Sequence, residues 1–282
     1  MKSALWRGLM RRKGLAGIAG IALVVSMGTT AVAKGFVPGC ELPFKDIAVK
    51  QSIDNICPIG GAAKGGAQLA QDQAKNNFCA TGDPVTVTFD TFSQLQSAAE
   101  AANIPFGMGM HLPPDRSLLK DLVEVGSPPV KIGEGSVVRL VAFIVEAHHS
   151  NVSKGESVNC KKHGKAYNDI HIVLGQTADA DPCDSVTAEI SPHYRPTSWD
   201  GLETYDLSTR PVRMTGQLFF DASHKPCSAG KRASPPRMAI WEIHPVYALD
   251  VCKKNALADC KADDDTVWVP LDQWLGLEEE SP

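Results

Sequence analysis

Two pairs of ionisable residues in the second half of the chain have a spacing that suits metal binding or acid–base chemistry. Asp169 and His171 are two residues apart, and Glu242 and His244 repeat that spacing. Residues two apart in a β-strand project from the same face. If the two strands are neighbours, two imidazoles and two carboxylates converge, and these groups bind divalent metals or transfer protons. The four residues are therefore candidate metal ligands.

Glu189 and His193 form a candidate third arm of this site. The alternative for all of these residues is structural, with each histidine hydrogen-bonded beneath a loop. The chain contains no His-Glu-x-x-His, His-x-His or Cys-x-x-Cys motif, no Gly-x-Ser-x-Gly and no glycine-rich phosphate loop. No cofactor is evident, and a divalent metal is the one that the residue types allow.

The elements that must position these residues are strands. Five strand-like segments follow one another, with a long irregular connection at 191–209 between the third and the fourth; they span 137–147, 169–175, 186–190, 212–220 and 238–251. This order is typical of an OB-like, five-stranded Greek-key barrel, and the alternative is a small β-sandwich. The stretch 271–277 is expected to form a short helix. The fold class is therefore mainly β with some α.

Two basic loops are expected to meet at the ligand-binding edge of such a barrel. The segments 148–168 and 221–237 each carry a net charge of +3, which would concentrate an anionic ligand there. The candidate contacts are Lys161, Lys162, Tyr167, Lys231 and Arg232, and a glycan, a nucleic acid or an acidic peptide fits them. The alternative is that these are ordinary solvated side chains.

Three regions divide the chain. Residues 1–33 are typical of a signal peptide, because a basic stretch is followed by an apolar run and an Ala-Val-Ala cleavage site. Residues 34–133 are mixed α/β and loop-rich, with helices expected at 68–78, 91–102 and 115–122 and a strand at 85–89. Residues 134–282 carry the barrel and the short C-terminal helix. The mature protein is thus expected to be secreted or periplasmic, without stable membrane insertion.

All eight cysteines follow the expected cleavage site. An even number in an exported chain favours disulfides. Closure between neighbours in sequence favours three pairs, Cys57–Cys79, Cys160–Cys183 and Cys252–Cys260. Without residues 1–33 the chain has 23 basic and 32 acidic residues and a net charge of −9, which argues against general affinity for nucleic acids.

Several segments, among them NDIHI at 168–172 and WEIHP at 241–245, resemble a group of uncharacterised exported bacterial proteins. The resemblance covers about half of the chain, mainly 134–252, and implies no activity, so it assigns no residue a role. The leading hypothesis is a disulfide-stabilised binding module for an anionic or polymeric ligand. The alternatives are a metal-dependent, nuclease-like hydrolase that uses His171, Glu242 and His244, and a structural envelope protein.

Overall fold

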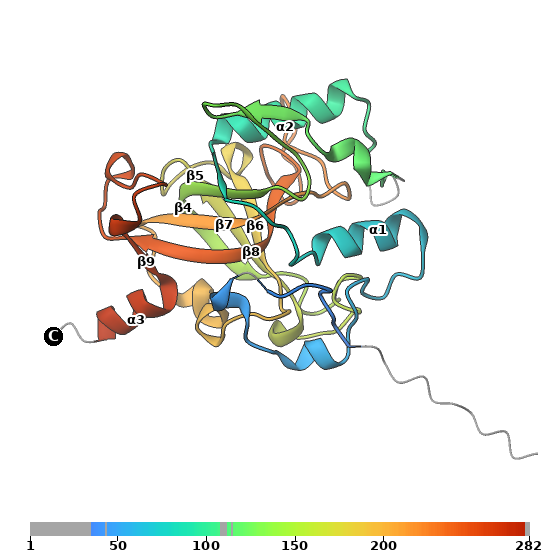
Figure 1. Ribbon diagram of the computed structural model, residues 1–282, viewed down its shortest axis with the longest axis horizontal. Helices are drawn as coiled ribbons and strands as arrows, with labels where there is room; N and C mark the ends of the chain where they lie inside the picture. Colours follow the sequence, from blue (N-terminus) through green and yellow to red (C-terminus); the bar gives the residue numbers. More distant parts are fainter. Residues whose placement is uncertain (1–34, 43, 108–111, 114, 280–282) are drawn as a thin grey trace, which may run out of the picture. The chain divides into compact units, whose positions relative to one another are not determined.

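Five long strands with alternating apolar residues close into a β-barrel (Figure 1). On β5, for example, Ile170, Ile172 and Leu174 are buried in the main hydrophobic core, while His171 between them projects from the other face. The barrel strands are β4 (Val137–His149), β5 (Ile170–Gly175), β6 (Val186–Ile190), β7 (Pro211–Phe220) and β8 (Trp241–Cys252).

The order of the strands around the barrel is β4-β5-β6-β8-β7, and β7 pairs back with β4 to close it. The β6–β8 pair is parallel, and the other pairs of the barrel are antiparallel. The connection from β6 to β7 is the long one and contains the 3-10 helix η6 (Thr197–Thr204). This is the architecture of an OB-like barrel, so the predicted fold class is confirmed.

The computed structural model describes residues 35–42, 44–107, 112–113 and 115–279, and the side chains of 277–279 are not described. Residues Ala33–Pro282 form one compact unit. The predicted signal peptide, residues 1–33, lies outside the described residues. Within the described residues, no helix combines the length and the apolar character that a membrane span requires.

The predicted boundary near residue 133 falls inside this compact unit. Strand β1 (Val85–Val87) precedes that boundary and pairs in parallel with β4, and β9 (Trp268–Pro270) adds to the other side through β8. Strands β2 (Val123–Val125) and β3 (Val130–Ile132) form a separate antiparallel pair. The segment before the barrel therefore contributes to the same sheet and core.

In the part of the chain that the structure describes, three α-helices lie around the barrel (Figure 1): α1 (Gly66–Lys75), α2 (Phe89–Ala101) and α3 (Leu271–Glu279). Helix α2 begins earlier than expected because Thr88 caps it, accepting a hydrogen bond from the backbone N–H of Thr91. The remaining short elements are 3-10 helices: η1 (Lys45–Ile47), η2 (Ser52–Asn55), η3 (Arg116–Leu119), η4 (Lys165–Tyr167), η5 (Pro182–Asp184), η7 (Leu257–Asp259) and η8 (Asp265–Val267).

The eight cysteines form four disulfides: Cys40–Cys79, Cys57–Cys160, Cys183–Cys227 and Cys252–Cys260. The predicted pairing of Cys252 with Cys260 is confirmed. The pairings Cys57–Cys79 and Cys160–Cys183 are wrong, because the fold brings together cysteines that are distant in sequence. Four disulfides are typical of a protein that works in an oxidising compartment.

Candidate metal centre

A row of polar side chains crosses the outer face of strands β5, β6 and β8. His171 on β5 lies opposite Glu189 on β6, and Glu242 on β8 lies opposite Thr187 on β6. The sequence left open whether β5 and β8 are neighbours; in the structure β6 lies between them. Glu189 therefore stands at the middle of the row, and it links the two pairs of residues that the sequence singled out.

Asp169, Glu189 and His244 can each present one ligand atom such that all three atoms lie within 4.8 Å of one another. All three residues are buried. Glu189 Oε2 lies 2.8 Å from His244 Nδ1. Two carboxylates and one imidazole form a donor set that zinc and similar divalent ions accept, and three protein ligands leave a position open for water or substrate. We call these three residues the triad.

Lys75, at the last turn of α1, places its ammonium group against the triad. Its Nζ lies 2.8 Å from Glu189, 3.3 Å from Glu156 and 3.6 Å from Asp169. Burial by itself lowers the pKa of Lys75, but the charges of Glu156, Glu189 and Asp169 raise it well above its ordinary value. One ammonium group therefore faces three carboxylates.

This shortage of positive charge affects the pKa values of the carboxylates. Burial raises the pKa of Asp169 well above its ordinary value, against the opposing charge of Lys75. Burial also acts to raise the pKa of Glu189, but Lys75 and His244 together hold that pKa well below the usual range. Lys75 thus lowers the pKa of Glu189 but does not offset the effect of burial on Asp169. A second cation or a proton would balance the remaining charge.

Several polar atoms of this region are buried and have no hydrogen-bond partner among the described residues. They are Glu242 Oε2, both ring nitrogens of His171 and Nε2 of His244, whereas Asp169 Oδ2 contacts Lys75 and Glu189 Oε2 contacts Lys75 and His244 Nδ1. Buried polar atoms are nearly always satisfied, so a concentration of exceptions calls for an explanation. A divalent ion is one that fits, because it would bind carboxylate oxygens and imidazole nitrogens together.

A cavity of about 490 Å³ opens beside the triad. Its walls come from α1, from the β4–β5 loop, from the β7–β8 loop, and from His171 and Glu189 of the barrel face. The two loops meet here as expected for the ligand-binding edge of an OB-like barrel. The triad therefore lies beside the place where this architecture holds its ligands.

The basic side chains proposed from the sequence as ligand contacts do not line this cavity. Lys161, Lys162, Lys231 and Arg232 are exposed and Tyr167 is half-buried, and none is among the residues that line the cavity. Arg232 forms an exposed ion pair with Asp181. Binding of an anionic ligand by these residues therefore stays a prediction.

Glu242, the fourth predicted ligand, is engaged by an arginine. Arg237 forms ion pairs with Glu242 and, at 3.4 Å, with Asp221, and all three side chains are almost completely buried. Burial raises the pKa of Glu242 well above its ordinary value, and the charges of Glu189 and Asp221 add to this effect. His224 bonds to Asp221 on the side facing the cavity. No pattern in the sequence indicates that Arg237 and Asp221 form a buried pair.

His193 does not join the triad. Its Nδ1 lies 2.7 Å from Asp54 Oδ1, and both side chains are buried away from the cavity lining. Lys75 and Glu156 were also not identified as site residues from the sequence. Lys75 lies on a predicted helix whose contact face the sequence does not specify, and Glu156 lies in a loop that is basic on average. His148 pairs in register with His171 but is exposed.

Comparison of the chain with protein-family models, with curated proteins and with solved structures gives no match. The relation of the chain to the exported bacterial proteins that share the NDIHI and WEIHP segments stays a prediction.

His171 predicts how the stability of the metal-free protein depends on pH. Burial lowers the pKa of His171 to about 4, against the opposing charge of Glu189. As the pH falls below about 6.5, the unfolded chain binds this proton before the folded protein does, so folding loses free energy until the pH reaches about 4.

For the original protein this loss in the free energy of unfolding is about 3 kcal/mol over that range. We expect the His171→Gln variant to lack this part of the pH dependence. The measurement is the free energy of unfolding in urea between pH 4 and pH 7, with a chelator present. Parallel pH profiles for the variant and the original protein would contradict a neutral, buried His171.

Proposed function

We propose that this protein is an exported, divalent-metal-dependent hydrolase whose ion is held by Asp169, Glu189 and His244. The observation that carries the proposal is the convergence of these three buried donors within 4.8 Å, where Asp169 and Glu189 share a single cation, the ammonium group of Lys75. Imidazole together with carboxylates favours zinc or manganese over magnesium or calcium, which prefer oxygen ligands alone.

The residues around the triad suit hydrolysis. A divalent ion supplies a Lewis acid and lowers the pKa of a water molecule. His171 lines the cavity, and its pKa of about 4 keeps the imidazole neutral near pH 7, so a ring nitrogen can accept a hydrogen bond from water or substrate. Arg237 also lines the cavity, where its charge is engaged by Glu242 and Asp221, so it holds these carboxylates in place beside the site.

The surface favours an anionic substrate, such as a phosphodiester. The two loops that line the cavity each carry a net charge of +3 in an otherwise acidic chain, and their lysines are exposed. Such loops raise the local concentration of anions around a site. Lys161, Lys162, Lys231 and Arg232 would then guide the substrate without taking part in the reaction. The hydrolase and the binding module predicted from the sequence would share this surface.

Export is part of the proposal. The signal-peptide pattern of residues 1–33 and the four disulfides both support a protein that acts outside the cytoplasm. No disulfide cysteine is a member of the triad, so oxidation of the eight cysteines leaves the proposed ligands unaltered.

The test is metal binding by the oxidised protein, produced through the export pathway. After treatment with a chelator and its removal, we expect calorimetric titration with Zn²⁺ or Mn²⁺ to give one equivalent. The Glu189→Gln and His244→Gln variants should bind roughly 100-fold more weakly or not at all, because each lacks one of three protein ligands. His163→Gln, an exposed substitution in the β4–β5 loop, is the matched control and should bind as the original protein does.

Hydrolysis is followed with bis(4-nitrophenyl) phosphate as the probe. We expect activity that requires the ion and disappears in the Glu189→Gln and His244→Gln variants. A folded, oxidised protein that takes up neither ion would overturn the metal centre. A protein that binds the ion but does not hydrolyse the probe would overturn the assignment of a phosphodiester substrate.

A further inference from the structure

Lys75 contacts the same carboxylates that a metal ion at the triad would bind. Its Nζ contacts Glu189 at 2.8 Å and Asp169 at 3.6 Å, and these are two of the three members of the triad. Resting on the metal centre proposed above, we infer that Lys75 is a tethered cation that occupies the carboxylates of the metal-free protein and is displaced when a divalent ion binds.

The distances make the two cations competitors. An ion bound to Glu189 Oε2 at about 2 Å would lie at most about 5 Å from Lys75 Nζ, because that oxygen is 2.8 Å from the ammonium group. Two cations this close in a buried site repel each other strongly. Each carboxylate that coordinates the ion also attracts the ammonium group of Lys75 less strongly. The ammonium group therefore moves away as the ion enters.

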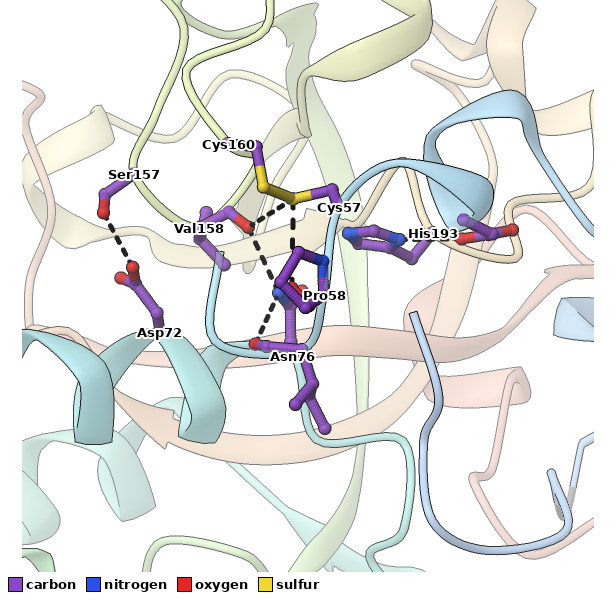
Figure 2. The surroundings of a disulfide bond; sticks show 10 residues. Cys57, Pro58, Asp72, Asn76, Ser157, Val158, Cys160 and His193 are labelled. Atoms are coloured by element: carbon purple, nitrogen blue, oxygen red, sulfur yellow. Dashed lines mark hydrogen bonds and ion pairs between the residues drawn. A yellow bond between two sulfur atoms is a disulfide. The ribbon is translucent and has the colours of Figure 1, made fainter. Parts of the chain in front are cut away.

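The movement is confined to the side chain, because the backbone on both sides of Lys75 is fixed. The carbonyl of Ala74 accepts a hydrogen bond from Gln217 Nε2 at 2.8 Å. On the other side, Asn76 Nδ2 donates to the carbonyls of Ile59 at 3.1 Å and Val158 at 3.3 Å, and Figure 2 shows Asn76 reaching toward Val158 beside the disulfide. Helix α1 thus stays in place.

The cavity provides the space for this movement. Lys75 lines it, and a lysine side chain has four flexible methylene groups that carry its charge. A rotation of the side chain would move Nζ away from the buried carboxylates and into the cavity, while the backbone of Lys75 stays in place. The exchange replaces one positive charge with two among Glu156, Asp169 and Glu189, which matches the charge of this cluster more closely than Lys75 does alone.

The first experiment compares metal affinities. We expect Lys75→Met to bind Zn²⁺ at least about tenfold more tightly than the original protein, because the competing charge is gone. Lys75→Arg keeps the charge and should not show this gain. Lys64→Met is the matched control: Lys64 is exposed and lies before α1, so its removal should leave the affinity unchanged.

The second experiment needs no variant. The original protein is treated with an acetylating reagent, with and without saturating Zn²⁺, and acetylation of each lysine is measured by mass spectrometry. Lys75, whose side chain is 12 % exposed, should be protected in the metal-free protein and become several times more reactive when the ion is bound. Acetylation of Lys64 should be the same in both states.

The outcomes separate this inference from the metal centre itself. If the original protein binds Zn²⁺, an unchanged affinity in Lys75→Met together with unchanged acetylation of Lys75 overturns the inference and leaves the metal centre standing. If only Lys75→Met binds the ion, Lys75 is not displaced in the original protein, and both its metal centre and the exchange are overturned. If neither protein binds Zn²⁺, both the metal centre and the exchange are overturned.

Discussion

Replacing Arg237 with methionine is expected to lower the free energy of unfolding by about 3–5 kcal/mol, because it leaves buried carboxylates without their cation. Arg237 is 1 % exposed, and its guanidinium group contacts Glu242 and Asp221, which are equally buried. The pKa of Asp221 is held well below its usual range by His224 and Arg237, against the effect of burial. Asp221 is therefore charged in the original protein, and removing the arginine takes away part of what stabilises that buried charge. The measurement is urea unfolding at pH 7.

The matched control is Arg232→Met in the same loop. Arg232 pairs with Asp181, but both side chains are more than half exposed, so water replaces the interaction and no measurable loss of stability is expected. A second variant identifies the cause. If buried charge is responsible, Arg237→Met combined with Glu242→Met should regain part of the stability that Arg237→Met loses. Equal effects of Arg237→Met and Arg232→Met would contradict the buried network.

The barrel could be predicted from the sequence because local pattern determines it. Ile170, Ile172 and Leu174 recur at every second position, and the long connection after β6 identifies the strand order. The same alternation placed His171 and Asp169 on one strand segment. Period-two patterning identifies the face on which a side chain lies, and this information is contained in a few neighbouring residues.

Contacts between segments that are distant along the chain could not be predicted from the sequence. The expected helix around residue 70 was correct in kind, but nothing in its sequence indicates that Lys75 meets Asp169 and Glu189. Because β6 lies between β5 and β8, Glu189 and not Glu242 lies between His171 and His244. Such contacts depend on tertiary packing, which local propensities and residue spacing do not specify.

The disulfide Cys57–Cys160 is one of these distant contacts, and it fastens the segment before α1 to the β4–β5 loop (Figure 2). The two segments also share a hydrogen bond from the N–H of Ala62 to the carbonyl of Ser157, and Ser157 in turn donates to Asp72 of α1. The same loop carries Glu156, which contacts Lys75. We therefore expect the Cys57–Cys160 disulfide to contribute both to the stability of the fold and to the geometry of the candidate site.

Replacing both Cys57 and Cys160 with alanine is expected to lower the free energy of unfolding by roughly 4–5 kcal/mol, because the bond closes a loop across 103 residues. The control is Cys252→Ala with Cys260→Ala. That bond spans only 8 residues, so its loss should destabilise the protein by about 2–3 kcal/mol. The measurement is urea unfolding of the oxidised proteins.

Metal binding distinguishes the two disulfides more sharply than stability does. Loss of Cys57–Cys160 frees the loop that carries Glu156 and Ser157 from the segment that leads into α1, so the affinity for Zn²⁺ should change in protein that is still folded. Loss of Cys252–Cys260, which packs with Trp268 in a separate small cluster, should leave it unchanged. Equal Zn²⁺ affinities in the two folded double variants would show that the cross-link stabilises the fold without positioning the site.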